Sequence, residues 1–349
     1  MALAALAFLL GVAYIPGTNE GAIASRWAVL ALAPCLLLFR SVRLTAGHWV
    51  AAGVVASAAM SLLWTPVADD GENAVIQLIL LSAVFCVGAA EEDLMLAYGG
   101  LAAAVWISAA LAVAQCFGFA AIDQYVAPAG LFANKNYLAE IAAAALVACV
   151  GLKMWKLALG PFVAVALTTC REVWMALAVV ACAWLWQKSR LAALACVCGA
   201  CLVVAMTVTE SNSISYRIAL WTNAAKQFTL AGNGAGSYDV LSQRTASDQM
   251  LLTARAEHAH NDYVEAIFDY GIGTILPAAI ILYALSAPRS VESAVLLCLL
   301  VEGLFGFPWH LPATAFFGAL VAGRLCASRA RLRVAMGNGR HFGLARKWA

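Results

Sequence analysis

Charged residues are scarce in this sequence. Asp, Glu, Lys and Arg make up only 11% of the 349 residues, whereas hydrophobic residues make up 64% and the mean hydropathy is +0.86. Soluble domains carry about 25% charged residues, so a soluble fold could not cover this apolar excess with polar surface. Intrinsic disorder is also excluded, because it requires low hydrophobicity. The composition predicts a polytopic membrane protein.

An excess of charge of one sign is also missing. Lys and Arg number 21 against 19 for Asp and Glu, and this balance provides no basic field for nucleic acid. The first apolar run, residues 1–16, has no basic residue, so we expect a retained helix rather than a signal peptide. The apolar runs have the length of membrane helices, about 16–25 residues, which excludes a β-barrel.

The 11 cysteines do not form the pattern of a disulfide framework. They lie in or at the edge of apolar runs, and none falls in the long polar segment 210–262. Cys196, Cys198 and Cys201 are close together but lack His or acidic neighbours. We therefore expect the cysteines to act as small apolar residues in helix packing rather than as metal ligands.

Apolar segments of near-membrane length recur along the whole chain. They predict an all-α integral membrane protein with about 12 transmembrane helices and one long periplasmic loop that contains short helices. The approximate ranges are 1–16, 24–39, 47–63, 74–90, 94–119, 137–152, 155–169, 172–187, 191–209, 263–285, 290–306 and 311–327.

The distribution of Lys and Arg predicts the orientation. If both termini are cytoplasmic, the cytoplasmic connections and tail carry about twice as many Lys and Arg as the other side, as the positive-inside rule requires. Residues 1–327 then form one membrane domain, and residues 328–349 form a basic cytoplasmic tail. The periplasmic loop, residues 210–262, connects the ninth and tenth helices, and its residues 213–230 have helical periodicity.

Polar residues in so apolar a chain are informative, because each charge at membrane depth costs several kcal/mol. Arg171 stands between two apolar segments, where it could also anchor a helix end beside Glu172. Arg217 and Trp221 lie one turn apart on the expected helix of the loop, where Arg217 could also be only solvated. Lys135 and Asn136 precede the sixth apolar segment, in which Asn134 or Asn136 could cap a helix.

The densest polar run is residues 257–265. His258, Asp262 and Glu265 are expected near one face of a helix, and His260 is expected to point elsewhere. A zinc site is disfavoured, since His-x-His is not the spacing that places two ligands on one helix face. A histidine at a membrane surface is better suited to act as a general base.

These segments together resemble the O-antigen ligase and O-antigen polymerase superfamily of bacterial envelope glycosyltransferases. The resemblance spans roughly residues 125–325, with the motifs in the family's order. The residues that carry it are 132–136, Arg171, Arg217 with Trp221 and 232–237, 260–263 with 271–273, and Phe307-Pro308 with Pro312.

The resemblance implies an inverting transferase that moves a glycan from undecaprenyl pyrophosphate to an acceptor hydroxyl. Arg171 and Arg217 would stabilise the leaving pyrophosphate, and His260 would be the general base, with His258 as a second candidate. No metal and no cofactor is expected. The residues expected around the substrates are Asn261, Glu265, His258, Asn136, Lys135 and Trp221, of which Asn261 or Glu265 would orient the imidazole.

The resemblance implies an inner-membrane enzyme whose active site faces the periplasm among membrane lipids, with the lipid A core or another saccharide as acceptor. A ligase is favoured, and a polysaccharide polymerase or a protein O-oligosaccharyltransferase stays open. Two other classes also stay open. One is a glycolipid flippase or transporter, and the other is a metal-dependent transferase that uses Asp69 and Asp70.

Overall fold

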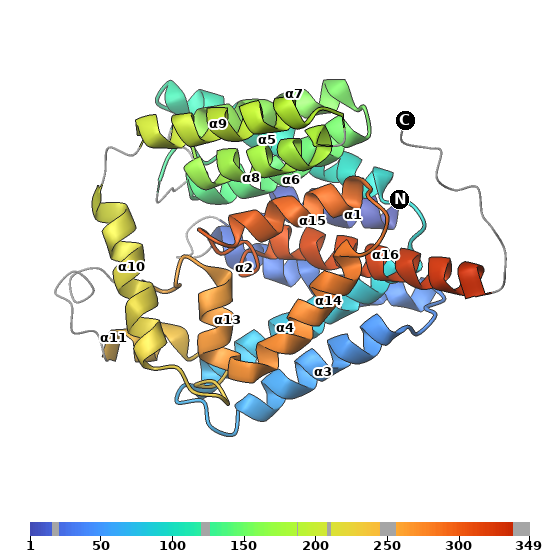
Figure 1. The fold of residues 1–349 in the computed structure, drawn as a ribbon, viewed down its shortest axis with the longest axis vertical. Helices are drawn as coiled ribbons and strands as arrows, with labels where there is room; N and C mark the ends of the chain where they lie inside the picture. The colour runs from blue at the N-terminus through green and yellow to red at the C-terminus, as the bar shows by residue number, and fades with distance from the viewer. Residues whose placement is uncertain (16–20, 120–125, 187, 208–210, 245–255, 338–349) are drawn as a thin grey trace.

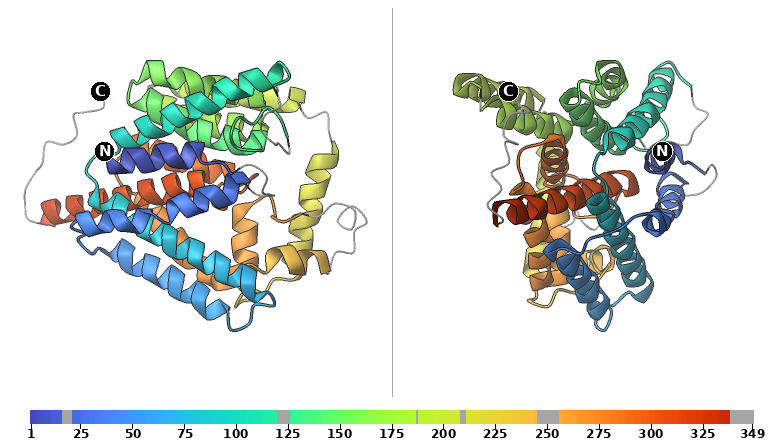
Figure 2. Two further views of the ribbon diagram at one scale, coloured as in Figure 1. Left: turned by 180° about the vertical axis from the view of Figure 1, so that it is seen from behind. Right: turned by 90° about the vertical axis from the view of Figure 1, so that its right-hand side faces the viewer.

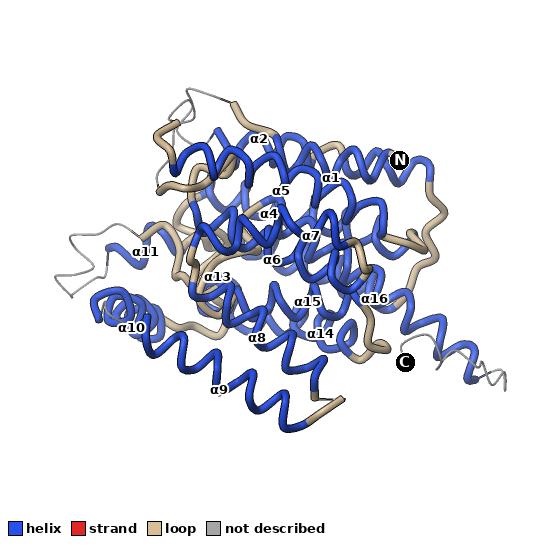
Figure 3. Tube along the Cα trace, turned by 90° about the horizontal axis from the view of Figure 1, so that it is seen from above, coloured by secondary structure: helices blue, strands red, loops and turns tan. Residues whose placement is uncertain are grey.

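The structure is a computed structural model, which describes residues 1–15, 21–119, 126–186, 188–207, 211–244 and 256–337. The described residues are 75% helical and form no strand, only one isolated bridge between Val126 and Asn134. Figure 1 shows the helices packed into a bundle, and Figure 3 shows the same helices joined by loops from above. The predicted all-α fold is confirmed.

The helices are joined mostly by short connections. Their bounds are α1 (Ala2–Val12), α2 (Gly21–Leu30), η1 (Ala33–Phe39), α3 (Ala46–Ser61), α4 (Ala68–Ala90), α5 (Met95–Cys116), α6 (Lys135–Gly151), α7 (Trp155–Thr168), α8 (Arg171–Leu185), α9 (Arg190–Thr207), α10 (Ser211–Lys226), α11 (Tyr238–Arg244), α13 (Asp262–Tyr270), η2 (Gly271–Thr274), α14 (Ile275–Leu285), α15 (Val291–Glu302) and α16 (Pro312–Gly337).

Each of the twelve apolar segments coincides with helix, and α10 matches the helix expected in the loop. Among the described residues, four spans are long and apolar enough to cross a membrane: Ala22–Phe39, Ala68–Ala90, Met95–Cys116 and Asp262–Leu285. Together with the apolar composition they indicate a multi-pass membrane protein. The count of 12 transmembrane helices stays a prediction, as does the periplasmic placement of residues 210–262.

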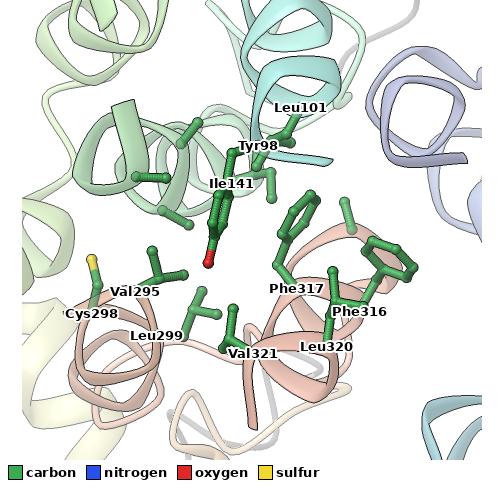
Figure 4. Packing of buried hydrophobic residues seen from close by; sticks show 14 of the residues in the cluster. Tyr98, Leu101, Ile141, Val295, Cys298, Leu299, Phe316, Phe317, Leu320 and Val321 are labelled. Carbon is green, nitrogen blue, oxygen red and sulfur yellow. The ribbon is translucent and has the colours of Figure 1, made fainter. Parts of the chain in front are cut away.

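Small residues allow the helices of the core to pack closely. A Cβ at Gly88 of α4 would collide with the Leu320 carbonyl of α16, and one at Gly323 would collide with the Phe85 carbonyl. Close backbone approach at small residues is typical of membrane helix pairs, where dispersion replaces the hydrophobic effect. Figure 4 shows the adjoining core, in which the Tyr98 and Phe317 rings stack with centroids 6.0 Å apart.

The loop helices gather at one end of the bundle. Figures 1 and 2 show α10, α11 and α13 at that end, whereas α1 begins and α16 ends at the other. Residues 245–255 of the predicted loop and 338–349 of the predicted tail lie outside the described residues. The arrangement separates the polar loop helices from both described ends of the chain.

Candidate functional site

The polar run 257–265 forms a turn that leads into α13. Asn261 caps this helix, because its side-chain oxygen accepts hydrogen bonds from the Tyr263 and Val264 amides at 3.0 and 3.1 Å. The Asn261 amide group also donates to the Leu304 carbonyl at 3.0 Å. The helix begins at Asp262, so His258 precedes the helix instead of sharing its face. Asn261 holds backbone through these contacts, and its predicted role at the substrate stays a prediction.

The turn itself is fixed from two sides. Trp221 of α10 donates its indole N–H to the Ala259 carbonyl at 2.9 Å, and the Ala259 amide donates to Glu265 at 2.9 Å. His260 has φ = 50°, in the left-handed region that few side-chain-bearing residues adopt. Trp221, which was expected at the substrate, is therefore one of the groups that shape the histidine turn.

Four ionisable side chains form one hydrogen-bonded network. Glu265 Oε1 lies 2.9 Å from His258 Nδ1 and 3.2 Å from His310 Nε2. The other ring nitrogen of His310, Nδ1, lies 2.9 Å from Asp262 Oδ1. Glu265 and Asp262 are buried, each with a side chain only 6% exposed, while His258 and His310 are 29% and 33% exposed. The imidazoles thus lie between two buried carboxylates and the surface.

The electrostatics of His310 follow from this position. Burial opposes the charged imidazole, but the carboxylates of Glu265 and Asp262 outweigh burial and raise the pKa of His310 to about 9. His310 is therefore an imidazolium near pH 7. No motif or spacing in the sequence points to His310, although it lies two residues after Phe307-Pro308.

The same network contains donor atoms that could hold a metal ion. One nitrogen or oxygen from each of His258, Glu265 and His310 lies within 4.8 Å of the others. Among the described residues, these three form the candidate metal-binding group. His260, paired with His258 in the zinc interpretation of the sequence, does not belong to it. Asp69 and Asp70 do not belong to it either and are exposed in the first turn of α4.

Phe307 connects the histidine turn to the start of α6. Its ring centroid lies 4.5 Å from that of His258, 5.4 Å from that of His260 and 5.6 Å from that of Tyr137. The segment before Tyr137 therefore lies beside the histidines. There Asn134 caps α6 by accepting from the Asn136 amide at 2.9 Å.

Lys135 and Asn136 occupy the first turn of α6 and are half-buried. The segment before them is anchored by Arg26 of α2, whose buried guanidinium donates to the Leu131 carbonyl at 3.1 Å and faces the Phe132 ring at 3.9 Å. This anchoring places the first turn of α6 next to the Phe307 connection.

Arg217 lies on α10, one turn before Trp221, and is half-buried. Burial and then the positive charge of Arg217 lower the pKa of His260 to about 4. His260 is therefore a neutral imidazole at pH 7, close enough to a guanidinium for that charge to act on it.

Arg171 is the first residue of α8. Burial, then the carboxylates of Glu172 and Glu140, raise the pKa of the preceding Cys170 well above its usual value. Glu140 is buried, and its carboxyl lies 2.6 Å from where a Cβ of Gly306 would be. Glu140 therefore acts electrostatically on the start of α8 and also lies beside Gly306, in the connection that carries Phe307.

The glycine-rich segment 231–237 braces the far end of α13. The Asn233 amide donates to the Phe268 carbonyl at 2.9 Å, and the Asp269 carboxylate accepts from the Gly236 amide at 3.1 Å and the Ser237 hydroxyl at 2.9 Å. A Cβ at Gly232, Gly234 or Gly236 would collide with a neighbouring segment, so the glycines are close-packing positions that support this end of α13.

Comparison with known proteins identifies the family of this region. The family model for O-antigen ligase matches residues 157–279, and none of the curated proteins compared matches the chain. The match includes Arg171, Arg217, Trp221 and the whole histidine turn, but ends before His310. The resemblance inferred from the sequence is thereby confirmed, because residues 157–279 of this chain match the O-antigen ligase family model.

Proposed function

We propose that this protein is a membrane glycosyltransferase that moves a glycan from undecaprenyl pyrophosphate to an acceptor hydroxyl. The observation that carries the proposal is the position of the histidine turn between a guanidinium and a buried carboxylate. His260 lies within the field of Arg217, and His258 is bonded to Glu265. A transfer of this kind needs both a cation for the leaving group and a base for the acceptor.

The leaving pyrophosphate gains negative charge as its bond to the sugar breaks. Arg217 and Arg171 are proposed to bind it, since a planar guanidinium can donate two parallel hydrogen bonds to phosphate oxygens. A histidine of the 258–260 turn takes the proton of the acceptor hydroxyl, which attacks the anomeric carbon from the opposite side and inverts it. The pyrophosphate already activates the donor, so no nucleotide or other cofactor is needed.

The location of the site favours an enzyme over a transporter. The site residues lie where the candidate span Asp262–Leu285 begins, at the end of the bundle that holds α10 and α11. Transporters instead hold their ionisable groups near the middle of the membrane. We propose that this end faces the periplasm of the inner membrane and that the acceptor is the lipid A core.

A transfer assay tests the proposal. Purified protein is given a defined undecaprenyl-pyrophosphate glycan and three acceptors: lipid A core, a carrier-linked repeat unit and a Ser/Thr peptide. We expect a glycosylated lipid A core. Product on the repeat unit or on the peptide alone would instead establish a polymerase or a protein transferase.

Variants of Arg217 link the assay to the site. Arg217→Lys should lower transfer about 10²–10³-fold, because an ammonium cannot replace the two-pronged guanidinium. Arg40→Ala is the matched control, since Arg40 pairs with Glu91 at 2.6 Å just beyond the far end of α4. Equal transfer by wild type, Arg217→Lys and Arg40→Ala would contradict the proposed site.

A further inference from the structure

We propose that Glu140 and Glu302 form a proton-binding site inside the helix bundle, in which each carboxyl group carries a proton near pH 7. A second step concerns the candidate active site and rests on the proposed function. The neutral state of Glu140 leaves the positive charge of Arg217 available to the anionic donor. Neither glutamate has a part in the transfer mechanism proposed above.

Both glutamates are deeply buried. Glu140 of α6 is 2% exposed, and Glu302, the last residue of α15, is 0% exposed. In the part of the chain that the structure describes, neither carboxyl forms an ion pair, and the Oε2 atom of each lacks a hydrogen-bond partner. Glu302 Oε1 accepts from the weak S–H donor of Cys298 at 3.5 Å. Cys298 itself belongs to the apolar cluster that Figure 4 shows with Val295 and Leu299.

A carboxylate in such surroundings is very unfavourable. Removal of its charge from water costs several kcal/mol unless a cation and hydrogen-bond donors compensate it. A neutral carboxylic acid avoids most of this cost. Ionisable residues in apolar helices are rare and are usually functional, so two of them without a compensating cation need an explanation.

Glu140 reaches the end of the helix that carries Glu302. Helices α6 and α15 pack against each other. A Cβ at Gly306 would lie 2.6 Å from Glu140 Oε1 and 3.4 Å from the Glu302 carbonyl oxygen. The Gly306 amide donates to that carbonyl at 2.8 Å. The carboxyl of Glu140 therefore lies against the last turn of α15, in space that a glycine leaves free.

This location disfavours a negative charge on either group. The last carbonyls of a helix carry partial negative charge, which repels a carboxylate but accepts a hydrogen bond from a carboxylic acid. The other titratable and charged groups that face the pair are Cys170 and Glu172 at the start of α8, Asp262 of α13, Arg217 of α10 and Cys298 of α15. The carboxylates of this set outnumber its guanidinium, so protons on both glutamates minimise the repulsion.

A proton fits the pair better than a metal ion does. The candidate metal-binding group of the described residues contains neither glutamate. Cations such as Mg²⁺ and Ca²⁺ require about six or more oxygen ligands, whereas the group that contacts Glu302 Oε1 is a thiol. A proton needs only one carboxyl oxygen.

The neutral state of Glu140 matters for Arg217 because charges act over a long range at low dielectric. The charge of Arg217 acts on Glu140 and also on His260 of the histidine turn. An ionised Glu140 would offset part of this positive charge and weaken the binding of an anion. A protonated Glu140 does not, so the pyrophosphate of the donor experiences the undiminished charge of Arg217.

Infrared spectroscopy of the purified full-length protein tests the protonation directly. The C=O stretching band of a carboxylic acid is separate from the bands of a carboxylate and shifts in D₂O. At pH 7, Glu140→Gln and Glu302→Gln should each lose one carboxylic acid band relative to the wild type. Glu92→Gln is the matched control, because the Glu92 side chain is 87% exposed and should lose carboxylate bands. Loss of carboxylate bands in Glu140→Gln or Glu302→Gln would overturn the inference.

Thermal unfolding distinguishes a proton from a bound cation. A cation that binds the folded protein raises its Tm. We expect wild type, Glu140→Gln and Glu302→Gln to respond alike to added Na⁺, Mg²⁺ or Ca²⁺. A cation that stabilises the wild type but neither variant would make the pair a cation site and reject the proton. Failure of both variants to fold would also reject it, since Gln has the shape and neutrality of the protonated side chain.

Binding of anions tests the second step. Glu140→Gln should keep the donor KM and the inhibition constant of inorganic pyrophosphate near the wild-type values, because one neutral group replaces another. If Glu140 were ionised, this change would strengthen binding by about 10-fold, the equivalent of one pKa unit, and such a result would contradict the step. If the wild type transfers glycan to none of the acceptors, the proposed function fails, whereas the infrared result still decides the protonation of the pair.

Discussion

The half-buried His310 imidazolium predicts that folding stability falls in alkaline solution. Its ring is held between Asp262 and Glu265 at 2.9 and 3.2 Å, and its pKa is raised from 6.5 to about 9. The perturbation is deprotonation, which removes the cation but leaves both buried carboxylates in place. Two unpaired carboxylates in a buried site are destabilising.

The direction follows from proton linkage. The folded state holds the His310 proton more tightly than the unfolded chain, so this contribution to the free energy of unfolding is complete below about pH 6.5. It is lost as the pH rises through about 9. A displacement of this size corresponds to about 3 kcal/mol. The side chain is 33% exposed, and solvent screening reduces the expected contribution to about 1–2 kcal/mol.

Thermal unfolding of the purified protein between pH 6 and 10 measures this contribution. The Tm of the wild type should fall by a few degrees more than that of His310→Gln across this range, since Gln does not titrate. Subtraction of the two curves removes the contributions of other groups that titrate at alkaline pH. Parallel curves for the two proteins would refute the reasoning, as would a wild type that becomes more stable with rising pH.

Three further predictions concern the cap, metals and topology. Asn261→Ala should lower the free energy of unfolding by about 1–2 kcal/mol. The loss should exceed that of Asn134→Ala, because Asn261 also donates to the Leu304 carbonyl. Equal changes in Tm for the two variants would contradict this prediction. Transfer should survive EDTA, because guanidinium groups are proposed to bind the pyrophosphate; a strict need for added divalent metal would contradict it. An exposed cysteine placed at Thr229, in a background without reactive cysteines, should react with an impermeant reagent from the periplasm. Labelling of Thr229→Cys only after lysis of the inner membrane would reverse the topology.

The helices were predictable because their signal is local. Each apolar segment of near-membrane length coincides with helix, and the polar periodicity of residues 213–230 corresponds to α10. The N-cap of α13 could also be predicted from the sequence. Asn261 precedes a first turn that contains Asp262 and Glu265, which is typical of a helix start. The polar residues continue without interruption from 257 to 265, however, so their pattern alone does not exclude His258 from the helix.

The contacts of the network were not predictable because they join distant residues. His310 lies 45 positions after Glu265 and on a connection between two apolar helices, so no spacing rule relates the two. The indole of Trp221 likewise reaches a backbone carbonyl 38 residues away. Sequence patterns identified the residue types that carry chemistry, but the pairing of His258 with Glu265 required the packing of α10, α13 and the Phe307 connection.

The charges of the site reconcile two conflicting demands of the proposed reaction. The donor carries a pyrophosphate, which buried carboxylates such as Asp262 and Glu265 would repel. The turn nevertheless keeps Glu265 within 2.9 Å of the His258 imidazole. His310 offsets part of the carboxylate charge on one side of Phe307, and Arg217 supplies positive charge near His260. This division lets an anion approach the turn while Glu265 keeps its contacts with His258 and His310.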